Sequence, residues 1–281
     1  MKLDRFRYSV TSQFGEDGLL AYLIDAYPTV PRICLEVGAG DGVRLSNTHR
    51  LWATLGWRAL LIEQDATKLS GRFGHLPNVS IVETTITARG ESSLDAIAHR
   101  MGFPAEIGIA SIDIDSFDYW VFARLEYLKP VIAVIEFNPR IPAHIDYCDP
   151  EGIALLRHSA KAMARLAAEK GYRVVACTGP NAVLVNEATI ATNPTAVPDL
   201  SIEELFDHAY AKRFSKTLVG AQHVTDLPIY TRRPTFLMRS YGQLHYTWLT
   251  LKKRTANTSR GMVHSISPEL RSHVERSGLW T

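Results

Sequence analysis

Short apolar runs alternate with amphipathic stretches through the first two thirds of this chain, and this alternation constrains its fold more than any other feature. One run, VIAVIEF at residues 131–137, is almost continuously apolar, as expected of a strand that is covered on both faces of a sheet. Runs of this kind predict seven strands, at residues 33–37, 59–62, 79–82, 107–114, 131–137, 172–177 and 182–186.

The stretches between these runs have the spacing of helices, with apolar residues every three or four positions. We predict helices at residues 15–26, 47–55, 92–100, 119–128, 152–170 and 202–214. Repeated strand–helix units predict an α/β fold with a doubly wound, mostly parallel sheet of seven strands. Only the short turn at residues 178–181 separates the last two strands, so the last strand should be antiparallel.

The pattern weakens beyond residue 194, where we divide the 281 residues into a core (residues 1–194) and a C-terminal extension (residues 195–281) with a short strand at 235–239. Residues 1–200 carry 19 Lys and Arg against 23 Asp and Glu, whereas residues 201–281 carry 12 against 6. A basic segment can meet an anionic substrate, a membrane surface or nucleic acid. The basic residues are scattered and no nucleic-acid-binding module accompanies them, so we expect no nucleic-acid partner.

A glycine-rich stretch, EVGAGDG at residues 36–42, directly follows the first predicted strand. Glycines there let the backbone turn sharply and approach a ligand without a Cβ in the way. A nicotinamide fingerprint has its third glycine one residue later, where this chain has Val43. Glu63 ends the second strand, 21 residues after Gly42, and a carboxylate at that strand end can accept hydrogen bonds from both hydroxyls of a ribose. The stretch and the acid together predict a cofactor site at this edge of the sheet.

Several other short motifs occur in order between residues 8 and 190. They are SQFGEDG at 12–18, SNT at 46–48, GW at 56–57, LLIE at 60–63, SIDID at 111–115, DYW at 118–120, VIEFN at 134–138, GY at 171–172 and NAV at 181–183. In these motifs and in EVGAGDG the chain resembles the FkbM-like family of class I S-adenosylmethionine-dependent methyltransferases. Ser116 stands where relatives often carry glycine, and a serine there restricts the backbone or adds a hydroxyl to the site.

The resemblance implies a Rossmann-like class I methyltransferase fold, S-adenosylmethionine as the cofactor, and O-methylation of a hydroxyl on a sugar, glycan or secondary metabolite. An acid such as Glu36 suits a cofactor that carries a cationic amino group and a sulfonium. The helix start at residues 12–17 could close over the cofactor, although plain capping explains Ser12 and Asp17 equally well. The residues expected to bind the cofactor are Gln13, Glu16, Glu36, Gly38, Gly40, Asp41, Asn47, Glu63 and Asp113.

Acidic side chains end the fourth and fifth predicted strands. Asp113 and Asp115 follow one strand, and Glu136 and Asn138 follow the other. The carboxyl ends of neighbouring strands face one crevice in a doubly wound sheet. Four oxygen-bearing side chains suit a hard divalent cation such as Mg²⁺, which would lower the pKa of an acceptor hydroxyl. The same acids could instead bind substrate hydroxyls, so the metal site stays one of two interpretations.

An alcohol is a poor nucleophile at neutral pH, so a base or a metal must assist its methylation. The candidate catalytic residues are Asp113, Asp115 and His144, which lies in the loop after the fifth strand. Asp118 is expected to cap the helix that begins at residue 119.

Two other classes of protein stay open. The D-x-D pattern at residues 113–115 also occurs in metal-dependent glycosyltransferases, but that interpretation leaves EVGAGDG and Glu63 unexplained. The second class is a non-catalytic protein that binds S-adenosylmethionine, but the acidic cluster would then have no function. Turnover with a suitable acceptor separates this second class from an enzyme.

The extension carries aromatic residues at Tyr210, Tyr230, Tyr241, Tyr246 and Trp248. Aromatic faces stack on sugar rings, and Arg and Lys bind carboxylate or phosphate groups. We therefore expect a hydroxylated, anionic carbohydrate or another sugar-containing small molecule as the acceptor, although the same aromatics could simply pack a small subdomain.

The remaining features concern the cell compartment. No apolar run reaches the roughly 18 residues that span a bilayer, and no apolar segment follows the basic start MKLDRFRYSV. Three separate cysteines fit no disulfide framework. We expect a cytoplasmic protein without a transmembrane segment, and the sequence leaves open whether it forms a homo-oligomer.

Overall fold

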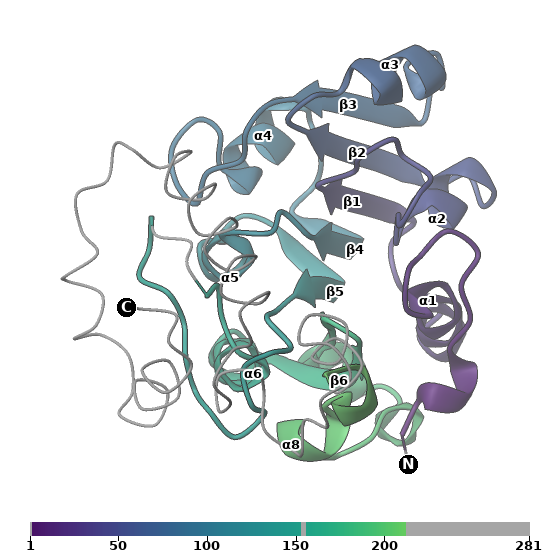
Figure 1. The fold of residues 1–281 in the computed structure, drawn as a ribbon. Coiled ribbons are helices and arrows are strands. Elements are labelled where there is room, and N and C mark those ends of the chain that lie inside the picture. The colour runs from purple at the N-terminus through teal and green to yellow at the C-terminus, as the bar shows by residue number, and fades with distance from the viewer. Residues whose placement is uncertain (1, 153–155, 212–281) are drawn as a thin grey trace.

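The computed structural model describes residues 2–152 and 156–211. Its strands are β1 (Ile33–Val37), β2 (Arg58–Glu63), β3 (Val79–Glu83), β4 (Glu106–Ile112), β5 (Lys129–Glu136), β6 (Tyr172–Thr178) and β7 (Asn181–Asn186). They form one seven-stranded sheet in the order β3-β2-β1-β4-β5-β7-β6 (Figure 1). Strand β7 is antiparallel to both of its neighbours, and the other pairs are parallel. The predicted doubly wound, Rossmann-like sheet with an antiparallel last strand is confirmed.

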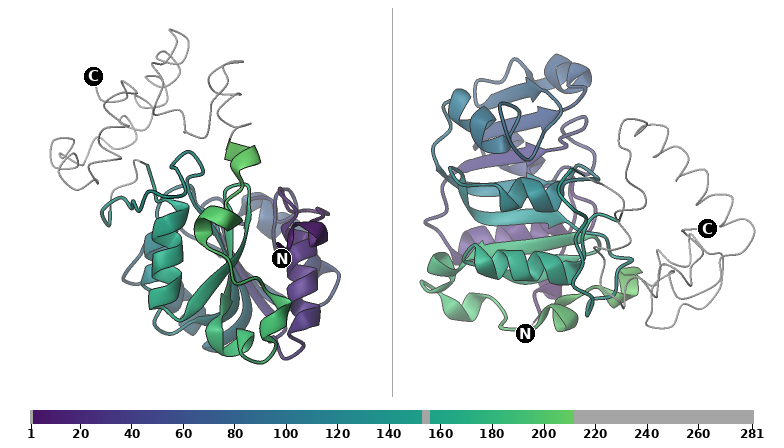
Figure 2. Two further views of the ribbon diagram at one scale, coloured as in Figure 1. Left: turned by 90° about the horizontal axis from the view of Figure 1, so that it is seen from below. Right: turned by 90° about the vertical axis from the view of Figure 1, so that its left-hand side faces the viewer.

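Helices cover both faces of the sheet, and Figure 2 shows the sheet between α1 on one side and α6 on the other. The longer helices are α1 (Glu16–Ala26), α2 (His49–Ala53), α3 (Thr67–Phe73), α4 (Leu94–Arg100), α5 (Asp118–Ala123) and α6 (Ala160–Glu169). Short elements complete the described chain: η1 (Asp4–Phe6), α7 (Glu187–Ile190), η2 (Pro194–Ala196) and α8 (Ile202–Leu205).

Alternating side chains of the strands feed two separate cores. In β1, Leu35 and Val37 pack on the face covered by α4, α5 and α6, whereas Cys34 packs on the face covered by α1, α2 and α3. Cys34 and Cys177 are buried free thiols, as small apolar residues would be. Because both faces bury apolar side chains, the polar groups of the strands gather at the strand ends.

The start of the chain packs against the end of its described part. The Tyr22 hydroxyl donates to the Ala196 carbonyl at 2.7 Å, and the Tyr27 hydroxyl donates to the Asn193 carbonyl at 3.1 Å. Arg7 forms an ion pair with Asp207 at 3.3 Å. These contacts hold the N-terminal segment and α1 to residues 193–207.

The described chain continues past the expected domain boundary at residue 194 without leaving the core. Ile202, Leu205 and Phe206 are buried in the same core as α4, α5 and α6. Residues 212–281 lie outside the described chain, and with them the expected strand at 235–239 and four of the five aromatic residues named above. Within the described segments, no helix has the length and apolar character needed to cross a membrane.

Three helix predictions were wrong at their boundaries. The helix expected at residues 152–170 begins only at Ala160, because Ser159 caps it by accepting a hydrogen bond from the Ala162 amide. The helix expected at residues 119–128 ends at Ala123. The helix expected at residues 202–214 is interrupted, because Phe206 has ψ 135°, and the chain is helical again at residues 208–211. Helix α3 (Thr67–Phe73) was not predicted.

Candidate functional site

The glycine-rich loop turns sharply at the end of β1. Gly38 has φ +79°, and a Cβ added to it would lie 1.8 Å from the Asp113 carbonyl oxygen. The amides of Gly38 and Ala39 both donate to the Ile62 carbonyl, at 2.9 and 3.2 Å. Gly40 has φ +57°, but no atom lies within 4 Å of a Cβ added there. The loop is therefore packed tightly against β2 and β4 at Gly38 and is open at Gly40.

Glu63 borders the open part of this loop. One carboxylate oxygen accepts a hydrogen bond from the Gly40 amide at 2.7 Å, and the other accepts from the Gln64 amide at 2.8 Å. The residue is only half-buried. The two features that predicted a cofactor site, the glycine loop and the acid of the second strand, therefore lie in direct contact.

Glu36 lies beneath the loop and is almost fully buried. Its carboxylate accepts hydrogen bonds from the Ser46 hydroxyl at 2.6 Å, the Asn47 amide at 2.8 Å and the Thr48 hydroxyl at 2.6 Å. Burial raises the pKa of this carboxyl, and the hydrogen bonds oppose the shift. In the described state Glu36 thus holds residues 46–48 in place, so both of its oxygens are engaged by the protein itself.

Asp41 and Asn47 are also bonded within the loop. Asp41 accepts hydrogen bonds from the amides of Val43 and Arg44, at 2.9 and 2.7 Å. The side chain of Asn47 donates to the Ser111 hydroxyl of β4 at 3.0 Å. These bonds fix the shape of the loop between β1 and α2.

The N-terminal segment before α1 is ordered by two buried acids. One Asp17 oxygen accepts hydrogen bonds from the amides of residues 10–12 at 2.7–2.9 Å, and the Asp17 amide donates back to the Ser12 hydroxyl. Glu16 accepts from the Phe14 amide and from the side chains of Thr178 and Asn181. Gln13 is exposed. The structure therefore gives Glu16 a clear internal role, tying this segment to the ends of β6 and β7.

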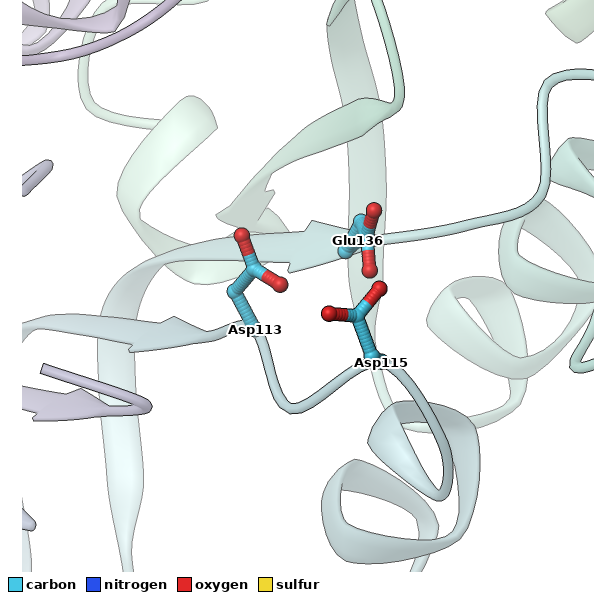
Figure 3. Close-up of side chains that lie close together, drawn as sticks. All are labelled: Asp113, Asp115 and Glu136. Atoms are coloured by element: carbon cyan, nitrogen blue, oxygen red, sulfur yellow. The ribbon is translucent and has the colours of Figure 1, made fainter. Parts of the chain in front are cut away.

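Three carboxylates face one another where β4 and β5 end (Figure 3). Oxygen atoms of Asp113, Asp115 and Glu136 lie within 4.8 Å of one another, as the prediction of an acidic cluster requires. Asp115 adopts the left-handed conformation with φ +56°, which turns the chain back toward the cluster. The desolvated surroundings and the Asp115 carboxylate raise the pKa of Asp113, and burial raises the pKa of Glu136 well above its ordinary value.

The sequence analysis missed one member of this cluster, Arg157. Its Nη1 atom donates to Asp115 at 3.2 Å and also to Glu136. The Arg157 side chain is only 19% exposed. The sequence pattern placed residue 157 in the helix predicted at 152–170, whereas Arg157 lies in the loop between β5 and α6, so its contact with the acids was not predicted.

Asn138 and His144, the other two predicted site residues of this region, are not among the three clustered carboxylates. The Asn138 side chain donates to the Leu156 carbonyl at 2.9 Å and accepts from the Arg140 amide at 3.0 Å. Both the nitrogen and the oxygen of its side-chain amide therefore form hydrogen bonds with the backbone. His144 is exposed on the loop after β5.

Asp118 does not cap α5, which corrects the capping prediction. The helix begins at Asp118 itself, and the carboxylate turns back to accept the amides of Ile114 and Ser116, at 2.8 and 3.1 Å. The Ser116 hydroxyl donates to the Ile114 carbonyl at 3.1 Å. The Ser116 side chain therefore closes the turn that carries Asp115.

The fit of this cluster to a divalent cation is incomplete. Three carboxylates are suitable oxygen ligands, and their spacing would allow them to share one ion. However, a guanidinium group already bonds two of them, and the oxygen of Asn138 is engaged by a backbone amide. The described arrangement is that of an acidic cluster with an internal counter-ion.

No model of a known protein family matches the sequence, and no curated protein matches it either. Among solved structures, a putative hemolysin from Streptococcus thermophilus is 14% identical with a TM-score of 0.44, over 75% of this chain and 78% of that one. A SAM-dependent methyltransferase from Aquifex aeolicus is 13% identical with a TM-score of 0.35, over 59% of this chain and 87% of that one.

The CMeT domain of the citrinin polyketide synthase is 13% identical with a TM-score of 0.37, over 56% of this chain. This chain spans 46% of the length of that domain. At such identities and TM-scores, these similarities assign no activity to this chain.

Proposed function

We propose that this protein is an S-adenosylmethionine-dependent methyltransferase of the FkbM-like family that methylates a hydroxyl group. The observation that carries the proposal is the contact between the Gly40 amide and the Glu63 carboxylate at the open side of the loop. A small ligand can approach the backbone there, and a carboxylate stands beside it to accept ribose hydroxyls.

The residues at this edge fit the cofactor in charge as well as in shape. S-adenosylmethionine would bring a methyl group on a positively charged sulfur. The two candidate cofactor-binding residues Glu63 and Asp113 both offer carboxylates, which favour a cationic ligand over a pyrophosphate. A dinucleotide would bring two negative charges to the same place.

Asp113 is the residue best placed to remove the proton of the acceptor. Its carbonyl packs against Gly38 of the loop, and its carboxylate belongs to the acidic cluster. A raised pKa makes a carboxylate a stronger base, and the pKa of Asp113 is raised. The acceptor oxygen attacks the methyl carbon in line with the breaking carbon–sulfur bond, whose electron pair stays on sulfur, while Asp113 takes the hydroxyl proton.

The test of the cofactor site is a binding measurement with a matched control. Calorimetry should show binding of S-adenosylmethionine and of its demethylated product, but not of NADH or a sugar nucleotide. Glu63→Gln should weaken this binding by about 1.5–3 kcal/mol, the scale of hydrogen bonds to a charged group. Glu106→Gln is the control, because Glu106 is an exposed acid at the start of β4, at the opposite end of the strands from the loop.

The outcomes separate the competing classes of protein. Binding of NADH or of a sugar nucleotide, with none of S-adenosylmethionine, would refute the proposal. Transfer of a labelled methyl group to a panel of neutral and anionic hydroxylated carbohydrates then identifies the acceptor. Cofactor binding without transfer to any hydroxyl compound would instead favour the non-catalytic binding protein.

A further inference from the structure

Arg157 occupies the position where the sequence analysis expected a metal ion. Its Nη1 atom hydrogen-bonds both Asp115, from the turn after β4, and Glu136, at the end of β5. These are two of the three carboxylates that could share a cation. A single positive group thus bridges the two strand ends, as a divalent ion would.

The backbone at Arg157 is held so that this contact is built into the fold. The buried carboxylate of Asp149 accepts the amides of Leu156 and Arg157, at 2.8 and 2.7 Å. The Asp149 amide donates to the Arg157 carbonyl at 2.8 Å. The Tyr147 hydroxyl in turn donates to the Asp149 carboxylate. Arg157 has φ +65°, a conformation that costs free energy for a non-glycine residue and persists only where its surroundings enforce it.

The positive charge of the Arg157 guanidinium compensates the negative charge of the cluster. Asp113 and Asp115 are exposed, but their oxygen atoms lie within 4.8 Å of those of the buried Glu136, so their repulsion favours a positive partner beside Glu136. Removing one partner of a buried ion pair is destabilising, because the remaining charge stays buried without compensation. The contacts of Arg157 with Asp115 and Glu136 both use Nη1, so one guanidinium nitrogen bridges the two strand ends.

We propose that Arg157, rather than a divalent cation, is the resident positive charge of the Asp113–Asp115–Glu136 cluster. As a positioning residue it keeps Asp115 and Glu136 in place and leaves Asp113 to act as the base. Methyl transfer at this site then proceeds without added divalent metal. This last statement rests on the proposed function, whereas the occupation of the cluster by Arg157 does not.

The test measures Mn²⁺ binding and thermal unfolding of the full chain, with neither cofactor nor acceptor present. The wild-type protein should bind no Mn²⁺ at this cluster, and its Tm should be equal in EDTA and in Mn²⁺. Arg157→Met should lower the Tm in EDTA, and Mn²⁺ should restore it. The variant should bind Mn²⁺ at least about tenfold more tightly than wild type, because a repelling charge has been removed from the cluster. Arg89→Met is the control, since Arg89 is exposed and pairs with Glu151, which is not part of the cluster.

One result would overturn the proposal: wild-type protein that binds Mn²⁺ as tightly as Arg157→Met and loses this binding in Asp115→Asn. If Arg157→Met does not fold, Mn²⁺ binding by the wild-type protein that is lost in Asp115→Asn overturns the proposal by itself. A protein that shows the expected Mn²⁺ behaviour but transfers no methyl group would retain the role of Arg157 and refute only the proposed function. If methyl transfer is observed, EDTA should leave its rate unchanged.

Discussion

Replacing Gly38 by alanine tests whether the glycine loop depends on close backbone packing. The new Cβ would lie 1.8 Å from the Asp113 carbonyl oxygen, whereas carbon and oxygen normally approach to about 3.3 Å. The end of β1 or of β4 must therefore move by about 1.5 Å to admit the methyl group. The left-handed backbone adds about 1–2 kcal/mol for a residue with a Cβ, and forced overpacking adds about 1–3 kcal/mol. We expect Gly38→Ala to lower the free energy of unfolding by about 2–5 kcal/mol.

Gly56→Ala is the matched control for this experiment. Gly56 has φ +69°, but no atom lies within 4 Å of its added Cβ. It should lose only the backbone contribution of about 1 kcal/mol. Urea unfolding followed by tryptophan fluorescence gives both values. If Gly38→Ala is no less stable than Gly56→Ala, the contact with Asp113 does not constrain the loop and the reasoning fails.

Gly40→Ala extends the same series from stability to binding. Gly40 is as open as Gly56 in the structure, so its substitution should cost a similar free energy of unfolding. Its Cβ would project into the side of the loop where we place the cofactor. Calorimetry should therefore show weaker binding of S-adenosylmethionine for Gly40→Ala, and unchanged binding would place the cofactor elsewhere.

Three further substitutions test buried polar groups. Burial lowers the pKa of His158 to about 3, so the stability it contributes is complete above the unfolded pKa near 6.5 and is lost as pH falls toward 3; His158→Phe should avoid a loss of about 3 kcal/mol between pH 7 and 4.5 in urea unfolding. Asp149→Ala should speed hydrogen exchange at residues 156–157, and unchanged protection there would contradict the role of Asp149 in holding Arg157. Asp17→Ala should cost about 2–3 kcal/mol of stability and speed exchange at residues 10–12, since one carboxylate oxygen accepts all three amides; a neutral result would make the buried acid dispensable.

Much of the fold follows from local sequence patterns. The run at residues 131–137 predicts a central strand because only a strand covered on both faces can be apolar at every position, and β5 pairs on both sides. The helix predicted at 152–170 was wrong at its N-terminal end, because the contacts that keep those residues out of a helix cannot be inferred from the spacing of apolar residues. Residues 156–159 are not helical, because the Asp149 carboxylate binds the amides of Leu156 and Arg157 and His158 forms an isolated β-bridge with Cys148.

The candidate site was predictable in place but not in detail. Strand ends position Glu63, Asp113 and Glu136, so the doubly wound pattern alone brings them to one edge. The role of each acid depends on the residues that it contacts. From the sequence alone, a buried acid such as Glu36 cannot be distinguished from an acid that faces a ligand. Arg157 reaches the cluster from a loop in a stretch whose apolar spacing predicted a helix, so the sequence pattern did not indicate this contact.

The bonds of Glu16 have a consequence for how the chain folds as it is made. Glu16 accepts a hydrogen bond from Asn181, 165 residues later in the sequence. At a synthesis rate of about 5–20 residues per second, roughly 10–30 s pass before that partner exists. Throughout this time Glu16 is without the Asn181 side chain that finally binds it, so the segment before α1 cannot complete its contacts until β7 has been made. Closing contacts over such long separations is slow, and a nascent chain arrested before β7 would leave the Glu16 carboxylate without this partner.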